Sequence, residues 1–371
     1  MEFIDLKTQQ KLIRSNILKR INIILDHGQY IMGPEIFELE KCLAEKVGVK
    51  YCISCSSGTD ALIIALMASN IGIGDAVLTT PFSYIATSGA ISMVGAIPVF
   101  VDINKDTFNI DPFKIEESIY YAEKSKLKPK AIIPVDIFGL PARYRLILEI
   151  SKKYNLKVIE DAAQSFGGSI GGRQSCSFGD VSATSFFPAK PLGCYGDGGA
   201  IFTNNKKLAE KIRSIRIHGQ GRDKYQNIRQ GLNGRMDTIQ AAILLEKIKV
   251  FPDELKKRNK VANYYKSNIS NIFRCQYIPK NYNSSWAQFS LLIPKKIDRS
   301  DVISNLKIKN IPVNIYYPNP LHLQKIHSNL NYKIGQFPIT EEIAKDIISI
   351  PMNPYLKKQE IDFIIENLNN H

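Results

Sequence analysis

Short apolar runs alternate with helix-length segments between residues 51 and 160 of this chain. The runs have the length of buried strands: Tyr51–Ser54, Ala76–Thr79, Pro98–Val101, Ala131–Val135 and Lys157–Glu160. The segments between them have helical spacing: Thr59–Ala68, Ala86–Val94, Ile115–Ala122 and Arg143–Lys153. This alternation predicts an α/β fold with a mostly parallel central sheet and helices on both faces. In such a sheet, ligands bind at the carboxyl ends of the strands.

The segments on either side of this region complete the predicted organisation. We expect further helices over residues 10–27, 35–47, 206–217 and 238–251, and hairpin strands at Ala183–Phe187 and Gly199–Phe202. Beyond Pro252 the spacing loosens, and residues 285–293, 310–316 and 339–349 suggest a small α+β unit. We therefore divide the chain into a large domain, residues 1–251, and a small C-terminal domain, residues 252–371. The N-terminal segment is counted with the large domain, although it could pack on the small domain instead.

Length and charge narrow the class of protein. The chain has 371 residues, is 44% hydrophobic and carries a formal net charge of +14. No stretch approaches the apolar length of a membrane span, and the first residues have no apolar segment typical of a signal peptide, so we expect a cytoplasmic protein without membrane insertion. The Lys and Arg residues are dispersed rather than gathered in a basic block, which argues against a nucleic-acid partner.

The six cysteines give no indication of disulfides or of a metal site. Cys52 and Cys55 have the C-x-x-C spacing, but they lie in an apolar, strand-like run and no second pair follows. A redox pair is expected to open a helix, and a zinc knuckle needs a second pair of ligands. We therefore expect reduced cysteines and no bound metal.

Asp161 follows a predicted buried strand, so its carboxylate points into the expected ligand crevice. A carboxylate at that place can keep the nitrogen of a cofactor's pyridine ring protonated. The alternative is a helix N-cap for the following Ala162 and Ala163. Taken alone, the residue fits the cap better.

Lys190 ends the apolar segment Ser185–Lys190, just before a glycine-rich stretch. Burial among aromatic residues lowers the pKa of a lysine, and an unprotonated amine forms imines with aldehydes. The alternative is an ordinary surface lysine in a loop.

The segment Cys55–Asp60 lies at a predicted strand-to-helix junction and is built of small residues. Such a junction can bring backbone N–H groups and the Thr59 hydroxyl to an anion, although an ordinary helix cap is the alternative. The three features together are more specific than each alone. An anion-binding loop, then a carboxylate, then a lysine is the order expected of fold-type I enzymes that use pyridoxal 5'-phosphate (PLP).

With these residues in place, the chain resembles the DegT family of nucleotide-sugar aminotransferases over nearly its whole length. The resemblance is carried by Gly33-Pro34-Glu35 with Leu39-Glu40, Ser57–Leu62, Glu160–Ser165, Ser185–Lys190, Gly196–Ala200 and Tyr317-Pro318. It implies a fold-type I PLP-dependent transferase with a smaller C-terminal domain. The cofactor would cycle between PLP and pyridoxamine 5'-phosphate.

The resemblance implies a role for each matching residue. Lys190 would hold PLP as a Schiff base and move protons, and Asp161 would bind the pyridine nitrogen. The remaining contacts would be Gln164 near the ring oxygen, Tyr84 stacked on the ring, Gly58, Thr59 and Ser185 at the phosphate, and Asn233 of the partner subunit. That last role implies a homodimer with shared active sites.

Within the family, the chain is most similar to enzymes that aminate carbon 3 of a UDP-linked 2-acetamido-2-deoxy-3-oxo sugar, especially the 3-oxo-glucuronate type. The resemblance implies L-glutamate as amino donor and a place in cell-surface glycan synthesis, such as lipopolysaccharide O-antigen. One departure is Tyr316, where such enzymes usually have histidine. Candidate substrate contacts are Tyr30, Arg229, Tyr316 and Tyr317, and a solvated side chain is the alternative for Arg229.

Three other functions remain open at this point. The first is an aminotransferase for a dTDP-linked 3- or 4-keto-6-deoxysugar, which would share the fold and the cofactor. The second is a sugar dehydratase of the same PLP family, but those relatives have histidine where this chain has Lys190. The third, suggested by the net charge alone, is a non-catalytic binding protein.

Overall fold

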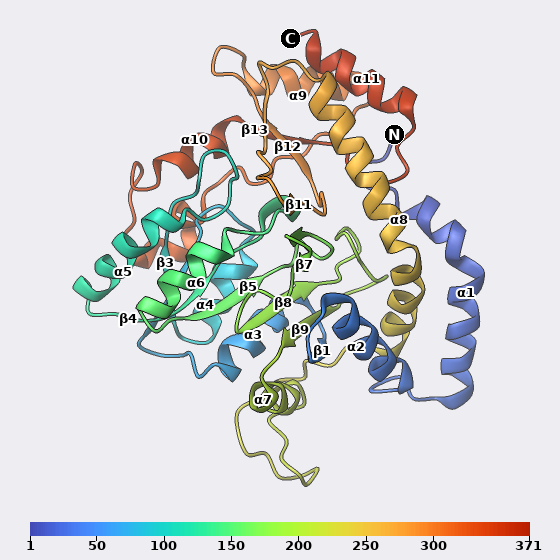
Figure 1. Ribbon diagram of the computed structural model, residues 1–371, viewed down its shortest axis with the longest axis vertical. Helices are drawn as coiled ribbons and strands as arrows, with labels where there is room; N and C mark the ends of the chain where they lie inside the picture. The colour runs from blue at the N-terminus through green and yellow to red at the C-terminus, as the bar shows by residue number, and fades with distance from the viewer.

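A twisted seven-stranded sheet forms the middle of the molecule, and the computed structural model describes residues 1–371 (Figure 1). Its strand order is β1-β9-β8-β5-β4-β2-β3, and β9 alone runs opposite to the other strands. The strands are β1 (Tyr51–Cys55), β2 (Asp75–Thr79), β3 (Ile97–Phe100), β4 (Lys128–Ile133), β5 (Lys157–Asp161), β8 (Val181–Ser185) and β9 (Gly199–Thr203). The mostly parallel sheet predicted from the sequence is confirmed, as is the hairpin formed by β8 and β9.

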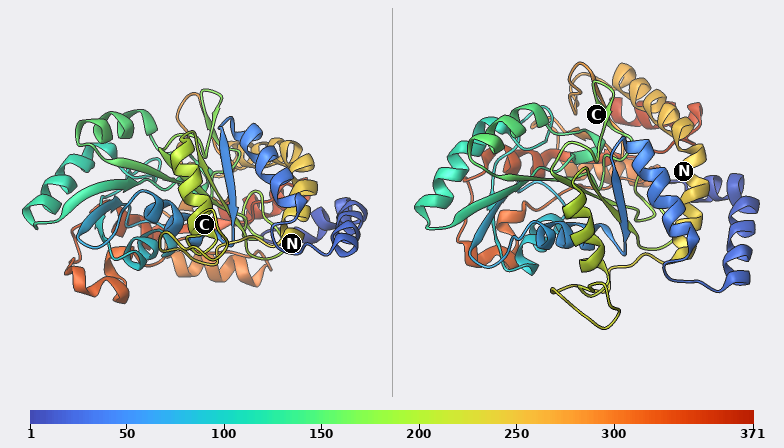
Figure 2. Two further views of the ribbon diagram at one scale, coloured as in Figure 1. Left: turned by 90° about the horizontal axis from the view of Figure 1, so that it is seen from below. Right: turned by 60° about the horizontal axis from the view of Figure 1, so that its bottom comes forward.

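Helices cover both faces of this sheet, as the turned views in Figure 2 show. The helices are α1 (Leu6–His27), α2 (Pro34–Val47), α3 (Gly58–Ala68), α4 (Ala86–Met93), α5 (Ile115–Lys124), α6 (Tyr144–Lys153), α7 (Lys206–Arg216), α8 (Thr238–Asn268), α9 (Arg299–Ile308), α10 (Pro338–Asp346) and α11 (Lys358–Asn369). Short 3-10 turns lie at Pro112–Lys114, Ile137–Gly139, Leu321–Leu323 and Lys325–Leu330.

Alternate residues of each strand face the two helix layers. Val77 packs with α3, α4 and α7, whereas its neighbours Ala76 and Leu78 pack with α5 and α6 on the other face. At the other end of the sheet, Cys52 faces α2 and α8. Because strand side chains alternate with a period of two, continuous apolar runs are what a sheet buried on both faces requires.

The C-terminal part of the chain surrounds a three-stranded antiparallel sheet of β10 (Arg274–Cys275), β12 (Phe289–Leu292) and β13 (Ile347–Ile350). Its apolar core includes Tyr265, Phe289 and Leu306, with residues of α8, α9 and α11. A further small sheet joins β6 (Ser169–Ile170) and β7 (Arg173–Gln174) to β11 (Tyr282–Asn283). The boundary at residues 251 and 252 stays a prediction, and β11 contacts the large part of the molecule across it.

Two sequence predictions for this region were wrong. The helix expected to end at Phe251 continues through Pro252 to Asn268. Proline removes one hydrogen bond of the helix, but buried residues on both sides, such as Phe251 and Val261, pack each half against a core. Residues 310–316 form neither helix nor strand, and only Asn314 pairs with Ser349.

The first residues of the chain lie beside its C-terminal part (Figure 1). The carbonyl of Phe3 accepts a hydrogen bond from the Met352 N–H at 3.3 Å, and Asn353 donates to the Glu2 carbonyl at 3.2 Å. None of the helices has the length and apolar character needed to cross a membrane.

Candidate active site

The carboxyl ends of β1, β5 and β8 meet at one edge of the central sheet and open into a cavity of about 440 Å³. Asp161 is the last residue of β5, Ser185 is the last residue of β8, and Ser57 and Gly58 follow β1. The predicted residues that line this cavity are Gly58, Thr59, Tyr84, Asp161, Gln164, Ser185, Lys190, Tyr316 and Tyr317. The volume lies in the range typical of small-ligand sites.

Asp161 is 4% exposed, and both of its carboxylate oxygens are oriented by hydrogen bonds. Thr87 on α4 donates its hydroxyl to Oδ2 at 2.7 Å, and the Ala163 N–H donates to Oδ1 at 3.2 Å. Burial raises the pKa of the carboxyl, while these hydrogen bonds and the charge of Lys190 lower it. The cap interpretation describes only the bond to Ala163, since no α-helix begins at Asp161.

Lys190 lies in a tight turn after β8, where its N–H donates to the Phe187 carbonyl at 2.9 Å. The Cys194 N–H donates to the Phe186 carbonyl at 2.7 Å and closes a longer loop around this turn. Burial lowers the pKa of the Lys190 amine, and the charge of Asp161 partly opposes that shift. A larger neutral fraction makes the amine a better nucleophile and proton acceptor at neutral pH.

The start of α3 forms the third side of the cavity. Ser57 is its N-cap, and the Ser57 hydroxyl accepts a hydrogen bond from the Asp60 N–H at 3.0 Å. A side chain at Gly58 would place its Cβ 2.6 Å from the Ser185 Cβ, so only glycine lets α3 come this close to β8. Free N–H groups at a helix start, together with hydroxyls, suit a phosphate.

Gln164 and two tyrosines form the side of the cavity opposite α3. The Phe138 N–H donates to Gln164 Oε1 at 2.7 Å, and Gln164 Nε2 donates to the Tyr317 hydroxyl at 3.2 Å. These bonds fix which amide atom faces the cavity. Tyr84 is 58% exposed, and its ring centroid lies 6.4 Å from that of Tyr317. Its exposed ring has a free face on which a flat cofactor can stack.

The residues of the cavity fit PLP. The phosphate would lie against Gly58, Thr59 and Ser185, and the buried carboxylate of Asp161 suits a protonated ring nitrogen, which would balance its desolvated charge. Lys190 supplies an amine in the same cavity. No group of His, Cys, Asp and Glu side chains is arranged to hold a metal ion.

Three predicted site residues lie outside this cavity. Tyr30 and Asn233 lie near the start of α8. The Tyr30 carbonyl accepts a hydrogen bond from the Thr238 N–H, and Asn233 Oδ1 accepts one from Arg235 Nε at 2.9 Å. Arg229 lies in the loop between α7 and α8. The chain therefore does not bring these three residues to its own cavity.

Sequence reasoning missed several residues of the cavity wall. Thr87 lay inside an expected helix, where nothing marked it as a partner of Asp161. Ile4 comes from the N-terminal segment, and Gln288 is the residue before β12. Neither lies in one of the motifs that marked the site.

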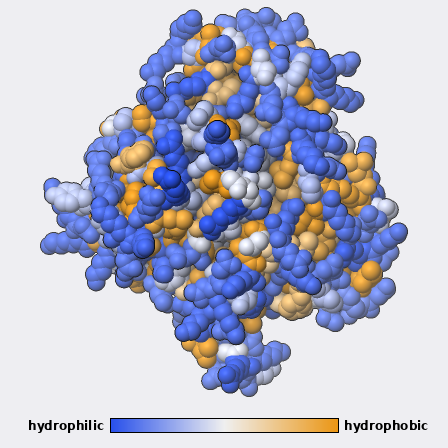
Figure 3. All heavy atoms as spheres, in the orientation of Figure 1, coloured by the Kyte–Doolittle hydropathy of each residue, from blue (hydrophilic) through white to orange (hydrophobic).

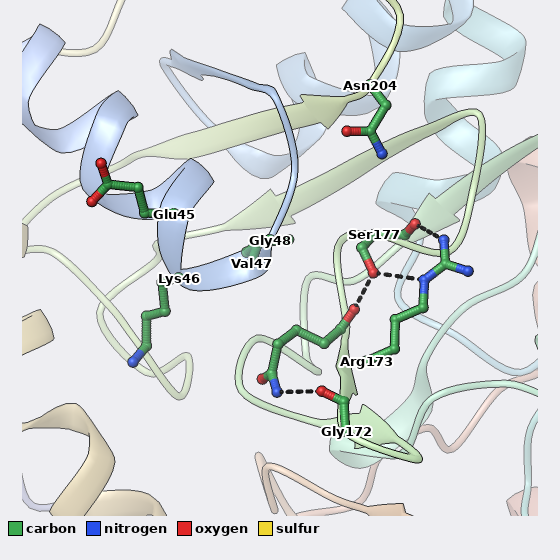
Figure 4. A pocket seen from close by; sticks show the side chains of 9 residues that line it. Glu45, Lys46, Val47, Gly48, Gly172, Arg173, Ser177 and Asn204 are labelled. Atoms are coloured by element: carbon green, nitrogen blue, oxygen red, sulfur yellow. Dashed lines mark hydrogen bonds between the residues drawn. The ribbon is translucent and has the colours of Figure 1, made fainter.

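A second hollow, of about 630 Å³, lies at the surface between the end of α2 and the β6–β7 turn (Figure 4). Arg173 donates to the Ser177 hydroxyl at 3.1 Å, and Gln174 donates to the Gly172 carbonyl at 3.1 Å. The side chains of Arg173 and Gln174 are thus already bonded to the wall of the hollow. None of the predicted site residues lies there, and we assign no site to it.

Comparison with known proteins gives matches over the full chain. Residues 11–369 match the DegT/DnrJ/EryC1/StrS aminotransferase family. A UDP-2-acetamido-2-deoxy-3-oxo-D-glucuronate aminotransferase of Pseudomonas aeruginosa is 46% identical over 371 residues, covering 100% of both chains. A dTDP-3-amino-3,6-dideoxy-alpha-D-galactopyranose transaminase of Aneurinibacillus thermoaerophilus is 37% identical, covering 100% of this chain and 99% of the relative.

Solved structures agree with this result. An aminotransferase from Brucella abortus superposes with a TM-score of 0.96 at 43% identity, covering 100% of this chain and 99% of the other. NtdA from Bacillus subtilis, solved with bound cofactor PMP, gives 0.89 at 31% identity and covers 99% of this chain and 82% of the other. These matches confirm the predicted fold and the predicted PLP cofactor.

Proposed function

Because the chain belongs to the DegT/DnrJ/EryC1/StrS aminotransferase family, we propose that it transfers an amino group from L-glutamate to carbon 3 of a UDP-linked 2-acetamido-2-deoxy-3-oxo sugar, the uronate form in particular. The chain is a PLP-dependent sugar aminotransferase. The observation that carries the choice of sugar is the 46% identity, over the full length of both chains, to an aminotransferase named for the UDP-linked 3-oxo-glucuronate. The cavity supports the reaction type, since it brings Lys190 and Asp161 together.

The residues of the cavity divide the work of the reaction between them. When bound, PLP supplies an aldehyde that condenses with amines and a ring that withdraws electrons. We propose that Lys190 Nζ removes the α-proton of the amino donor and later delivers a proton to the sugar carbon. Asp161 holds the proton of the ring nitrogen in place, and Thr87 orients Asp161. Gly58, Thr59 and Ser185 anchor the phosphate.

We further propose a homodimer in which Asn233 of the partner subunit reaches the phosphate. Asn233, Arg229 and Tyr30 lie outside the cavity of their own chain, as a contribution to a second copy requires. Hydrophobic residues also show on the side of the molecule where α1 and α2 lie (Figure 3). The exposed ones on these helices are Leu12, Leu18, Ile23, Leu25 and Phe37. Exposed apolar patches of this kind favour a protein interface.

We place the reaction in the cytoplasm, in the synthesis of a cell-surface glycan. All six cysteines are free, and Cys52, Cys55, Cys176 and Cys194 are buried. Free thiols are typical of a reducing compartment. Nucleotide-linked sugars are intermediates of glycan assembly, so the UDP-linked amino sugar would serve as a precursor of the glycan.

A substrate panel tests the proposed function. The purified enzyme with PLP and L-glutamate is offered UDP-2-acetamido-2-deoxy-3-oxo-glucuronate, the corresponding 3-oxo-glucose compound, and dTDP-linked 3- and 4-keto-6-deoxysugars. Mass spectrometry of the sugar and an assay of 2-oxoglutarate then report amino transfer. We expect the highest kcat/KM with the UDP-linked uronate. A higher kcat/KM with a dTDP sugar would favour the alternative substrate class, and loss of water without amino transfer would favour a dehydratase.

A further inference from the structure

The N-terminal segment Glu2–Asp5 lies between the C-terminal part and the start of α1 and is held at both ends. On one side, Met352 and Asn353 donate hydrogen bonds to the Phe3 and Glu2 carbonyls at 3.3 and 3.2 Å. On the other side, Asp5 caps α1 by accepting the Thr8 N–H at 2.9 Å. A segment fixed at both ends in this way presents the residue between them in a defined position.

Helix α1, which follows this segment, is anchored in the interior. Gln9 Nε2 donates hydrogen bonds to both carboxylate oxygens of Glu254 on α8, at 2.7 and 3.0 Å, and both side chains are buried. Tyr355 also donates its hydroxyl to Glu254. The start of the chain is therefore built into the fold rather than resting on its surface.

Ile4 faces the active-site cavity from this segment. It lines the cavity that contains Asp161 and Tyr84, and it also lines a small space of about 10 Å³ behind it, as Lys190 does. Ile4 therefore lies at the partition between the two spaces, beside the lysine. The neighbouring Phe3 ring packs edge-on against Tyr316, with 6.3 Å between ring centroids.

The two sides of the cavity have different origins. The residues that fit the cofactor, including Gly58, Asp161 and Ser185, all come from the carboxyl edge of the central sheet. Ile4 and Tyr316 come from the N-terminal segment and the C-terminal part. A cofactor bound at the sheet edge would leave the space next to Ile4 and Tyr316 for the substrate.

We propose that Ile4, held by the N-terminal segment, is a specificity-determining residue that contacts the keto sugar. The inference rests on the proposed function, because it takes the nucleotide-linked sugar as the ligand on this side. An isoleucine offers an apolar, uncharged surface, which favours an uncharged part of the sugar. A carboxylate in its place would repel the anionic nucleotide sugar.

Steady-state kinetics of Ile4→Ala and Ile4→Asp test this inference. We expect the KM for the keto sugar to rise about tenfold in Ile4→Ala, the size of effect that a lost apolar contact has in a binding pocket. The rise in Ile4→Asp is expected to be about a hundredfold, since a charge is added. The first half of the reaction is followed separately, by the change in cofactor absorbance when L-glutamate alone is added. Its rate should stay within about twofold of the wild-type rate.

Ile308→Ala and Ile308→Asp are the matched controls. Ile308 lies at the end of α9 and is 75% exposed, so these variants make the same changes away from the cavity and should leave both half-reactions unchanged. An unchanged KM for the sugar in both Ile4 variants would overturn the inference. An equal loss in both half-reactions would also overturn it, because Ile4 would then act through Lys190 or through folding. Failure of the wild-type enzyme to aminate any sugar in the panel would instead refute the proposed function.

Discussion

The cavity that Lys190 and Asp161 share changes the pKa values of both side chains. Burial shifts the pKa of the Lys190 amine downward and that of the Asp161 carboxyl upward, and each charge opposes the shift of the other. The sequence placed both residues, because they follow strands in a recognisable order. It could not place Thr87, because a threonine inside a helix has no pattern that reveals a partner 74 positions away.

Thr87→Val should shift the acid limb of the kcat/KM profile to higher pH. The variant keeps the shape of the side chain but removes the hydroxyl that donates to Asp161 Oδ2, and this hydrogen bond lowers the pKa of Asp161. Without the bond the carboxyl keeps its proton to higher pH, and we expect about tenfold lower activity on the acid side. Thr87→Ser, which retains a hydroxyl, should restore the profile. An acid limb that coincides with the wild type in Thr87→Val would contradict this role.

Lys247 gives a prediction for stability. It is 1% exposed, its Nζ lies 4.8 Å from the Tyr195 ring centroid, and burial lowers its pKa to about 8. The unfolded chain holds this proton up to about pH 10.4, so the destabilisation caused by Lys247 is greatest below about pH 8 and declines as pH increases between these values. Lys247→Met removes this pH-dependent contribution. The difference in free energy of unfolding between the variant and the wild type should therefore shift in favour of the wild type by up to about 3 kcal/mol between about pH 8 and about pH 10.4.

Urea unfolding at about pH 7 and about pH 10 measures this difference. Lys256→Met, which changes an exposed lysine of the same helix, is the control and should show no comparable change between the two pH values. If the difference between Lys247→Met and the wild type is the same at both pH values, Lys247 is not desolvated as the structure indicates.

At the scale of elements, the sequence predicted the central sheet well because periodicity and burial agree there. The continuous apolar runs at β2 and β5 match strands buried on both faces. It failed where tertiary packing overrides a local signal. Pro252 suggested the end of a helix, yet α8 continues because both of its halves pack on cores. Strands of two residues, such as β7, are too short to leave a pattern.

The junction of β1 and α3 is the element on which phosphate binding depends. In Gly58→Ala the added Cβ would meet the Ser185 Cβ at 2.6 Å, so α3 must move away from β8. We expect PLP to bind at least about tenfold more weakly, measured by titration of the apoenzyme. Gly89→Ala on α4, where nothing lies within 4 Å of the added carbon, is the matched control and should bind PLP like the wild type. Equal affinity in both variants would contradict the phosphate site at α3.

At the scale of the whole molecule, the sequence motifs identified the side of the cavity that belongs to the central sheet, and the resemblance added Tyr316 and Tyr317 on the other side. The structure adds Ile4 and Gln288 to that other side. No local pattern could place these two residues at the cavity, since their position depends on how the N-terminal segment and the C-terminal part pack against the large sheet. Asn233 lies outside the cavity of its own chain, so its proposed contact with the phosphate requires a homodimer.

Mixed dimers test that role. Lys190→Ala and Asn233→Ala should each be inactive or weakly active alone, because both active sites of each variant homodimer lack one required side chain. If sites are shared between chains, co-expression of the two variants gives dimers in which one site has both an intact Lys190 and Asn233 of the partner subunit. Random pairing then restores up to about a quarter of wild-type activity. No recovery in demonstrated heterodimers would contradict the shared site.

We propose that Lys190 carries the cofactor of this sugar aminotransferase. Reduction of the PLP-loaded enzyme with borohydride, followed by digestion and mass spectrometry of the peptides, tests this role most directly. We expect one cofactor-modified peptide, bearing the label on Lys190. Lys247 is the informative competitor, because it is buried and its pKa is lowered, as is the pKa of Lys190. Labelling of Lys247 instead of Lys190, or no labelled lysine in an enzyme that binds PLP, would contradict the assignment of Lys190.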